Sequence, residues 1–304
     1  MSVRITSTAI SRGGDTASIV AHSGRAAQQC LERAGIRPDQ VGVLINTGVF
    51  RDSNTLEPAM AALIQKEAGI GLEYAKNDPR TFAFDLMNGA TGVLEAVRVA
   101  TSILETGGAE YVLIVSGDTH PSLTRHAATD EFPYATCGAA MLLGRTDEPA
   151  GFGTVRSVAG AGTPAVEGYV DTSAMGATGR GAMTVVREDD FAERLLAAAV
   201  EAAAGVLAES ETVEPGDMAL VTSTPTPDFG GRIADALGID REHLRAPDLS
   251  DGDPHTAALT AAFDRAVAEN TLTGYSRVLF VAAGAGPTAA AVLYRLPAPA
   301  GVPA

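Results

Sequence analysis

Hydrophobic positions along the chain follow two alternating periods. Short, nearly continuous apolar runs have the length and composition of buried strands, and they cover residues 41–49, 111–117, 139–144, 218–223, 277–283 and 290–296. Longer segments with apolar residues at helical spacing lie between them, and they cover residues 17–35, 58–69, 91–108, 191–209, 230–238 and 256–270. Helices that alternate with such strands are typical of a largely parallel sheet covered on both faces. The pattern therefore predicts an α/β fold.

The same order of elements occurs twice along the chain. The first half runs from VGVLINTGV through FAFDLMNGATG and a long helix to YVLIVSG, and the second runs from MALVTS through DLSDGDPHTAA and a long helix to RVLFVAA. The offset of about 165 residues is too long for a solenoid repeat. We therefore predict two pseudo-symmetric halves, over 1–187 and 188–304. The Gly-, Ala- and Thr-rich stretch 145–187 is expected to form a cap or a flexible lid.

Composition excludes several classes of protein. The 304 residues carry 22 Lys and Arg against 37 Asp and Glu, a net charge of −15, which argues against nucleic acid or an anionic membrane as the main partner. The two cysteines, Cys30 and Cys137, are too few for a disulfide framework or a cysteine-rich zinc site. No apolar run approaches the roughly 20 residues of a membrane helix, and MSVRITSTAISRGGD lacks a signal-peptide core. We expect a soluble, cytoplasmic protein without a metal or a cofactor.

Two such halves back to back resemble the thiolase architecture, in which two buried central helices lie within five layers. The chain is similar to β-ketoacyl-acyl-carrier-protein synthase III of the thiolase superfamily in RPDQVGVLINTGV, PAMAALIQKEAGI, FAFDLMNGATGVLEA, EYVLIVSGD, ATCGAAMLLG, FGGRIADALGI, GDPHTAALTAAFDRAV and FVAAGAGPTAAAVLYRL. The resemblance implies acyl thioesters of coenzyme A or acyl carrier protein as ligands, in fatty-acid or polyketide metabolism. It also implies a homodimer, or a heterodimer with an active synthase, in which the central sheets join edge to edge.

The residues that carry the family's chemistry are replaced. The family condenses acyl groups through a cysteine at the N-terminus of a buried helix, where the helix dipole favours the thiolate. In FDLMNGATGVLEA this position falls on Ala90, whose methyl group cannot attack a thioester. Among its neighbours, Thr91 is the only conceivable nucleophile, and Asn88 reads as a turn residue or as part of a substrate site.

The other two members of the usual triad also differ. The family's histidine position falls on Pro227 in TSTPTPDFGGRI, and its second asparagine falls on Asp253 or Pro254 in GDPHTAA. The standard Cys-dependent condensation is therefore not expected. The turn AAGAGPT is retained, and in the family its backbone lines the active site, which implies a substrate-binding role for Gly284 and Gly286. The segment before the first helix is shorter than in the family, which puts coenzyme A binding in doubt or widens the entrance.

His255 is the sharpest catalytic candidate. It precedes the second buried helix at the point that the repeat relates to Ala90, where an imidazole can act as a general base or bond an acyl carbonyl. The alternative is a histidine that starts a helix and bonds Asp251 or Asp253. A serine nucleophile at Ser223 would need His255 as its base.

Other polar residues allow two interpretations each. Arg180, Arg187 and Arg232 either form a basic patch for an acidic carrier protein or are scattered solvated residues. His120 and His126 fit a polar loop better than a metal site, because six residues is not a standard helical ligand spacing. Both cysteines fit small buried core residues.

The sequence thus predicts a synthase III-like protein that binds acyl thioesters and is a non-catalytic or partner subunit. The alternative is an acyltransferase or thioester hydrolase with a rebuilt site that uses His255 with Ser223 or Thr91. Either hypothesis requires Ala90 to lie at the N-terminus of a buried helix and to face a cavity with His255 nearby.

Overall fold

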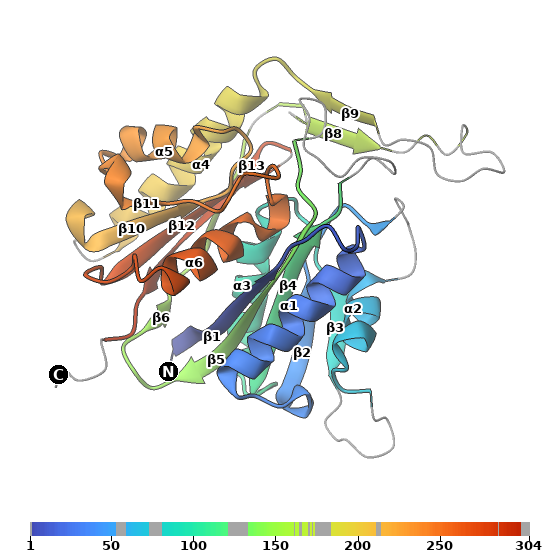
Figure 1. Cartoon of the computed structure of the whole chain (residues 1–304). Coiled ribbons are helices and arrows are strands. Elements are labelled where there is room, and N and C mark those ends of the chain that lie inside the picture. The colour runs from blue at the N-terminus through green and yellow to red at the C-terminus, as the bar shows by residue number, and fades with distance from the viewer. Residues whose placement is uncertain are drawn as a thin grey trace.

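Two α/β halves pack against each other in the computed structural model of the chain (Figure 1). The structure describes residues 2–52, 59–72, 81–120, 133–160, 162–163, 166–169, 171, 173, 184–210, 214–284 and 286–298. None of the helices in these ranges combines the length and the apolar character that a bilayer crossing requires.

The first sheet has the strand order β1-β5-β4-β2-β3. Its strands are β1 (Ser2–Ser11), β2 (Val41–Asn46), β3 (Phe82–Asp85), β4 (Tyr111–Asp118) and β5 (Cys137–Thr146). β2 is parallel to both β3 and β4, whereas β5 is antiparallel to β4 and β1. Helices α1 (Ile19–Ala34) and α2 (Met60–Ala68) cover the outer face and share an apolar cluster with this sheet.

The second sheet repeats this plan in the order β11-β10-β12-β13-β6. Its strands are β10 (Met218–Thr222), β11 (Leu244–Arg245), β12 (Arg277–Gly284), β13 (Thr288–Arg295) and β6 (Gly151–Phe152), and β7 (Arg156–Ala159) also pairs with β13. Helices α4 (Phe191–Glu209) and α5 (Phe229–Leu237) cover its outer face. β8 (Val166–Tyr169) and β9 (Thr184–Arg187) form a separate two-stranded ribbon (Figure 1).

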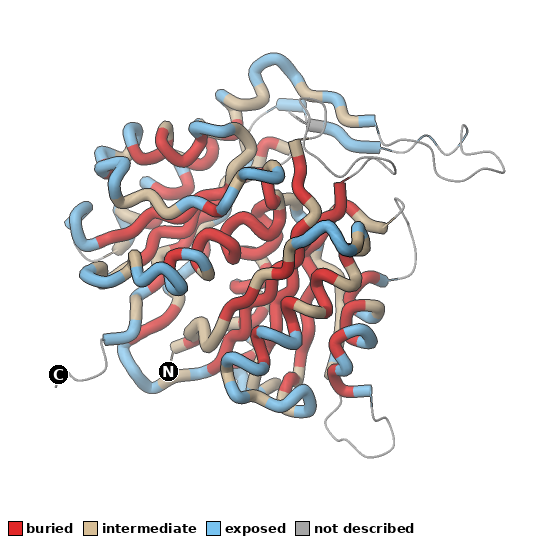
Figure 2. Tube along the Cα trace, viewed as in Figure 1, coloured by how far each residue is buried: buried red, intermediate tan, exposed pale blue. Residues whose placement is uncertain are grey.

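The central layer consists of α3 (Gly92–Glu105) and α6 (Ala258–Ala268), which lie between the two sheets. One apolar cluster joins Leu94 and Val97 of α3, Phe263 of α6, and residues of both sheets such as Ile114 and Phe280. Figure 2 shows the buried residues concentrated in these inner elements. The predicted thiolase-like arrangement of five layers with two buried central helices is therefore confirmed.

The internal repeat is regular in the central elements. α6 begins at Ala258, 166 residues after α3 begins at Gly92, and β12 begins at Arg277, 166 residues after β4 begins at Tyr111. β4 and β12 also have the same length, eight residues each. Equivalent positions in the two halves can therefore be named residue by residue.

The structure adds strands that the hydrophobic pattern does not predict. β1 consists of SVRITSTAIS, where Ser and Thr interrupt the apolar residues, and β3 has only four residues. β6 and β7 lie in the stretch 145–187, for which a cap or lid is expected, and they pair with β13 of the second sheet. The division of the chain at residue 187 stays a prediction.

Candidate functional site

Ala90 lies two residues before the first residue of α3 and is 4% exposed. The end of β12 approaches it closely, since a Cβ atom added to Gly284 would lie 3.2 Å from the backbone nitrogen of Ala90. Glycine permits this approach because it has no side chain. The start of the buried helix and the end of a central strand therefore form one junction.

A cavity of about 50 Å³ opens at this junction. It is lined by Ala90, Pro133, Tyr134, Arg187, Phe191, Leu195, Ser223, Pro225, Asp253, His255, Ala283 and Gly284. The structure thus brings Ala90 and His255 to one cavity at the N-terminus of a buried helix, as the sequence predicts. Their chemical roles stay predictions.

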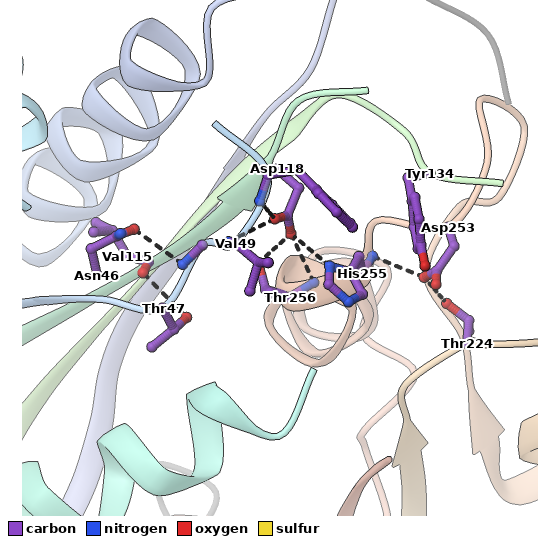
Figure 3. Close-up of polar contacts among 12 residues, drawn as sticks. Asn46, Thr47, Val49, Val115, Asp118, Tyr134, Thr224, Asp253, His255 and Thr256 are labelled. Atoms are coloured by element: carbon purple, nitrogen blue, oxygen red, sulfur yellow. Dashed lines mark hydrogen bonds and ion pairs between the residues drawn. The ribbon is translucent and has the colours of Figure 1, made fainter. Parts of the chain in front are cut away.

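His255 begins the 3₁₀ turn η6 (His255–Ala257), directly before α6. Its backbone is in the left-handed region, with φ of 51°, and its N–H donates to Oδ1 of Asp253 over 2.9 Å. The imidazole Nδ1 lies 3.1 Å from Oδ2 of Asp118 (Figure 3). The ring also packs against Phe50 and Tyr134, with centroid distances of 5.2 and 4.9 Å. Within the described ranges, its Nε2 has no hydrogen-bond partner.

Asp118, the last residue of β4, is completely buried and accepts hydrogen bonds at both oxygens. Oδ1 accepts the backbone N–H groups of Val49 and Phe50 over 2.8 and 2.6 Å. Oδ2 accepts from the backbone N–H and the hydroxyl of Thr256 over 3.1 and 2.6 Å, in addition to its contact with His255. Asp118, rather than Asp251 or Asp253, is therefore the partner of the His255 ring. Sequence analysis missed it, and its only signal is a lone carboxylate at the end of an apolar strand.

The charges of Asp118 and His255 stabilise each other. Burial raises the pKa of Asp118, but the neighbouring imidazole and the donated hydrogen bonds outweigh burial and leave that pKa below its usual value. Burial also lowers the pKa of His255, yet the Asp118 carboxylate outweighs it, so the pKa of His255 is raised. The pair is thus held as carboxylate and imidazolium.

Asp253 is a second carboxyl group at the cavity and is 9% exposed. Its Oδ1 accepts from the hydroxyl of Thr224 over 2.5 Å and from the backbone of His255 (Figure 3). Burial raises the pKa of Asp253, against the opposing effects of His255 and these hydrogen bonds. The cavity therefore contains two carboxyl groups with opposite shifts, one on each side of the imidazole.

The predicted hydroxyl nucleophiles are bonded to the backbone. Ser223 accepts the N–H of Ala283 over 2.9 Å and has its hydroxyl 3.3 Å from the carbonyl of the same residue. Thr91 donates to the carbonyl of Asn88 over 2.6 Å. Neither hydroxyl is bonded to His255, so the structure does not form the nucleophile–base pairs that the sequence suggested.

Four predicted substrate-binding residues lie away from the cavity lining. Pro227 is exposed in the turn before α5, and Pro225, two residues earlier, lines the cavity instead. Asn88 is also exposed, and Gly286 lies in the turn between β12 and β13 with φ of 124°. Arg232 on α5 forms an ion pair with Glu193 over 2.7 Å.

The remaining candidates separate into two groups. Arg187 lines the cavity, and its guanidinium lies 3.4 Å from the Tyr134 hydroxyl. Arg180 and His126 lie outside the described residues. Cys30 and Cys137 are buried, and burial raises the pKa of both thiols, to about 11 for Cys30.

Comparisons with known proteins agree with this fold. A family model described as 3-oxoacyl-[acyl-carrier-protein] synthase III matches residues 84–161. A β-ketoacyl-[acyl-carrier-protein] synthase III of Streptomyces lividans is 25% identical over 288 residues, which span 92% of this chain and 80% of that protein. An acyl-CoA:acyl-CoA alkyltransferase of Xanthomonas campestris pv. campestris is 28% identical over 139 residues, and the match spans only 40% of this chain and 38% of the relative.

Solved structures extend the similarity to nearly the whole chain. The 3-oxoacyl-(acyl carrier protein) synthase III of Pseudomonas aeruginosa PAO1 has a TM-score of 0.80 at 16% identity, covering 98% of this chain and 99% of that one. The priming β-ketosynthase of the R1128 polyketide pathway has a TM-score of 0.76 at 20% identity, covering 98% and 97%. The fold defines a thiolase-like protein. Within that class, the family model and the relatives' names make the chain a synthase III-like member of the thiolase superfamily.

Proposed function

We propose that this chain binds an acyl thioester of coenzyme A or acyl carrier protein in the Ala90 cavity without becoming acylated. It thereby serves as a non-catalytic or partner subunit in fatty-acid or polyketide metabolism. The observation that carries the proposal is the methyl group of Ala90, which faces the cavity at the start of α3, where the resemblance places the acylated cysteine.

The surroundings of Ala90 suit an acyl group but offer no nucleophile among the described residues. The start of α3 is the positive end of a helix dipole, which stabilises the partly negative oxygen of a thioester carbonyl. Thr91 and Ser223 use their hydroxyls in backbone contacts. The thiols of Cys30 and Cys137 are buried, and their raised pKa values keep them protonated.

Intact-protein mass spectrometry tests the proposal, combined with calorimetric binding of a panel of acyl-coenzyme A and acyl-carrier thioesters. The wild-type chain should bind at least one member and show no increase in mass. Ala90→Cys should gain the mass of one acyl group, because it places a thiol where the helix dipole favours the thiolate.

Ala100→Cys is a matched control, since Ala100 is buried on the same helix but does not line the cavity. It should show no acylation. Acylation of the wild-type chain, or equal acylation of both variants, would overturn the proposal, as would failure to bind any thioester of the panel.

The partner role is supported by the free edge of the first sheet. β3 ends the strand order, and Phe82 at its start is 65% exposed. Met87 and Leu72 are 51% and 40% exposed nearby in the sequence. An unpaired strand with exposed apolar residues is a template for another strand. We therefore propose that a second copy of the chain, or a related active synthase, pairs with β3.

A specific observation also favours the rebuilt site as a second candidate function. His255 is paired with a buried carboxylate and faces the cavity. Because Ser223 and Thr91 are bonded to the backbone, acyl transfer through either hydroxyl has little structural support. Water is the remaining nucleophile, which narrows this candidate to thioester hydrolysis.

A further inference from the structure

The cavity contains one basic nitrogen whose surroundings are arranged for proton transfer. Nδ1 of His255 is turned toward Asp118, which directs the opposite ring nitrogen, Nε2, away from the carboxylate. The residue lines the cavity, and its side chain is 13% exposed. Nε2 has no hydrogen-bond partner in the part of the chain that the structure describes. A water molecule in the cavity can therefore reach it.

Three separate contacts fix the imidazole. The carboxylate of Asp118 bonds Nδ1 and is itself held by four hydrogen bonds from Val49, Phe50 and Thr256. The rings of Phe50 and Tyr134 pack against the imidazole. A carboxylate on Nδ1 fixes the neutral tautomer with its proton on Nδ1, and so leaves the Nε2 lone pair for a proton.

The backbone of His255 is also held in an unusual conformation. Its φ of 51° lies in the left-handed region, which residues with a Cβ atom adopt at an energetic cost. The hydrogen bond from its N–H to Asp253 and the neighbouring bond from the Thr256 N–H to Asp118 hold this turn. Such a conformation persists only where its surroundings enforce it, and here it directs the side chain into the cavity.

We propose that His255 is a general base that activates a water molecule against the carbonyl carbon of a thioester bound beside Ala90, and that Asp118 is its positioning residue. This inference rests on the proposed thioester binding and adds a reaction to it.

The step needs only water as a second reactant. Nε2 takes one proton from water while the water oxygen forms a bond to the carbonyl carbon. The tetrahedral intermediate then collapses, the carbon–sulfur bond breaks, and the proton on Nε2 passes to the departing sulfur. The products are a carboxylic acid and a free thiol, and His255 returns to its neutral form without a covalent intermediate.

The charges that face His255 predict how the rate depends on pH. Asp118 raises the pKa of His255 above its ordinary value of 6.5, Asp253 acts in the same direction, and Arg187 opposes them. The Tyr134 phenol has a raised pKa through burial and stays neutral. Only the neutral imidazole is a base, so hydrolysis should increase as pH rises through the raised pKa of His255.

The test measures thiol release from the thioesters that bind, and oxygen incorporation from ¹⁸O-labelled water. The wild-type chain should release thiol and place one labelled oxygen in the acid, with no acylated protein detected. His255→Asn should reduce the rate by about 100-fold or more. Asparagine tolerates the left-handed backbone conformation, so this variant should keep the fold. His243→Asn is the control, because His243 bonds Tyr275 and does not line the cavity.

Asp118→Asn separates positioning from mere structure. If Asp118 acts through the imidazole, this variant should move the midpoint of the pH–rate profile to lower pH, and NMR titration should show the same decrease in the pKa of His255. A rate loss with an unchanged midpoint would overturn the positioning role.

The outcomes also separate this inference from the proposed function. Thioester binding without thiol release, or release that His255→Asn leaves unchanged, would overturn the hydrolysis and leave the binding proposal intact. Failure to bind any thioester would overturn both.

Discussion

Replacing Asp118 by asparagine is expected to destabilise the fold strongly. Asparagine offers one acceptor oxygen and one donor group where Asp118 has two acceptor oxygens. If its oxygen keeps the bonds to Val49 and Phe50, its NH₂ group must face the N–H of Thr256, because an amide hydrogen cannot accept that bond. The hydroxyl of Thr256 can rotate to accept, and His255 can change tautomer, but the backbone N–H stays unpaired.

The magnitude follows from this arrangement. Breaking a buried ion pair by removing one charge typically costs about 3–5 kcal/mol, and one unpaired buried N–H costs about 1–3 kcal/mol of that kind. We therefore expect the free energy of unfolding to fall by about 3–5 kcal/mol near pH 6. Urea unfolding followed by circular dichroism measures this difference. Asp235→Asn is the control, since that exposed carboxylate pairs with Arg241 at the surface and its loss should leave the unfolding midpoint close to wild type.

The pH dependence of this difference has a defined sign. The pKa of Asp118 is lowered in the folded chain, so its contribution is present above the unfolded value of about 3.9 and is lost as pH falls further. The pKa of His255 is raised, so its contribution is complete below about 6.5 and is lost as pH rises through the folded pKa. The variant should therefore differ most from wild type between these values and less at pH 9. A loss below about 1 kcal/mol at pH 6, or an equal loss at pH 6 and pH 9, would refute the ion pair.

Further predictions concern the sheet edge, the junction and the thiols. Phe82→Lys should halve the mass measured by light scattering and leave circular dichroism unchanged; an unchanged mass would exclude β3 as the interface. Gly284→Ala should cost about 1–3 kcal/mol, measured by urea unfolding, because its methyl would lie 3.2 Å from the nitrogen of Ala90; wild-type stability would contradict this close approach. Cys30 and Cys137 should react with a thiol reagent at pH 7.5 only after unfolding, and rapid labelling of the folded chain would contradict their burial.

The architecture was predictable wherever burial produces a long apolar signal. Every strand and helix predicted from the hydrophobic pattern has a counterpart, including the central helices α3 and α6. β1 escaped the pattern because its partly buried residues alternate with Ser and Thr, and it is positioned by pairing with β5 across the whole strand. Such a strand is specified by tertiary pairing more than by its own composition.

The site was predictable only in part, because its contacts join distant segments. The repeat relates Ala90 to the start of α6 and so indicated that His255 lies at an equivalent position. Asp118 lies 137 residues from His255, and its role depends on where β4 ends relative to the other half. Tyr134 and Arg187 also reach the cavity from segments without a periodic pattern.

The repeat explains why one junction holds a cavity and its counterpart does not. Asp118 and Gly284 are equivalent, since each ends its strand and they lie 166 residues apart. Thr256 and Ala90 are equivalent by the same offset, two residues before α6 and α3. At one junction, the carboxylate bonds the N–H of Thr256 and fills the space. At the other, glycine leaves the nitrogen of Ala90 uncovered by any side chain at that position.

The two junctions therefore have complementary roles. A carboxylate at the end of β4 closes one helix start and, through the same oxygen, orients His255. Glycine at the end of β12 keeps the other helix start open, and His255 lines the space that results. The chemistry of the cavity thus depends on an asymmetry between two equivalent positions. An aspartate in one half and a glycine in the other turn a duplicated scaffold into a single polar site.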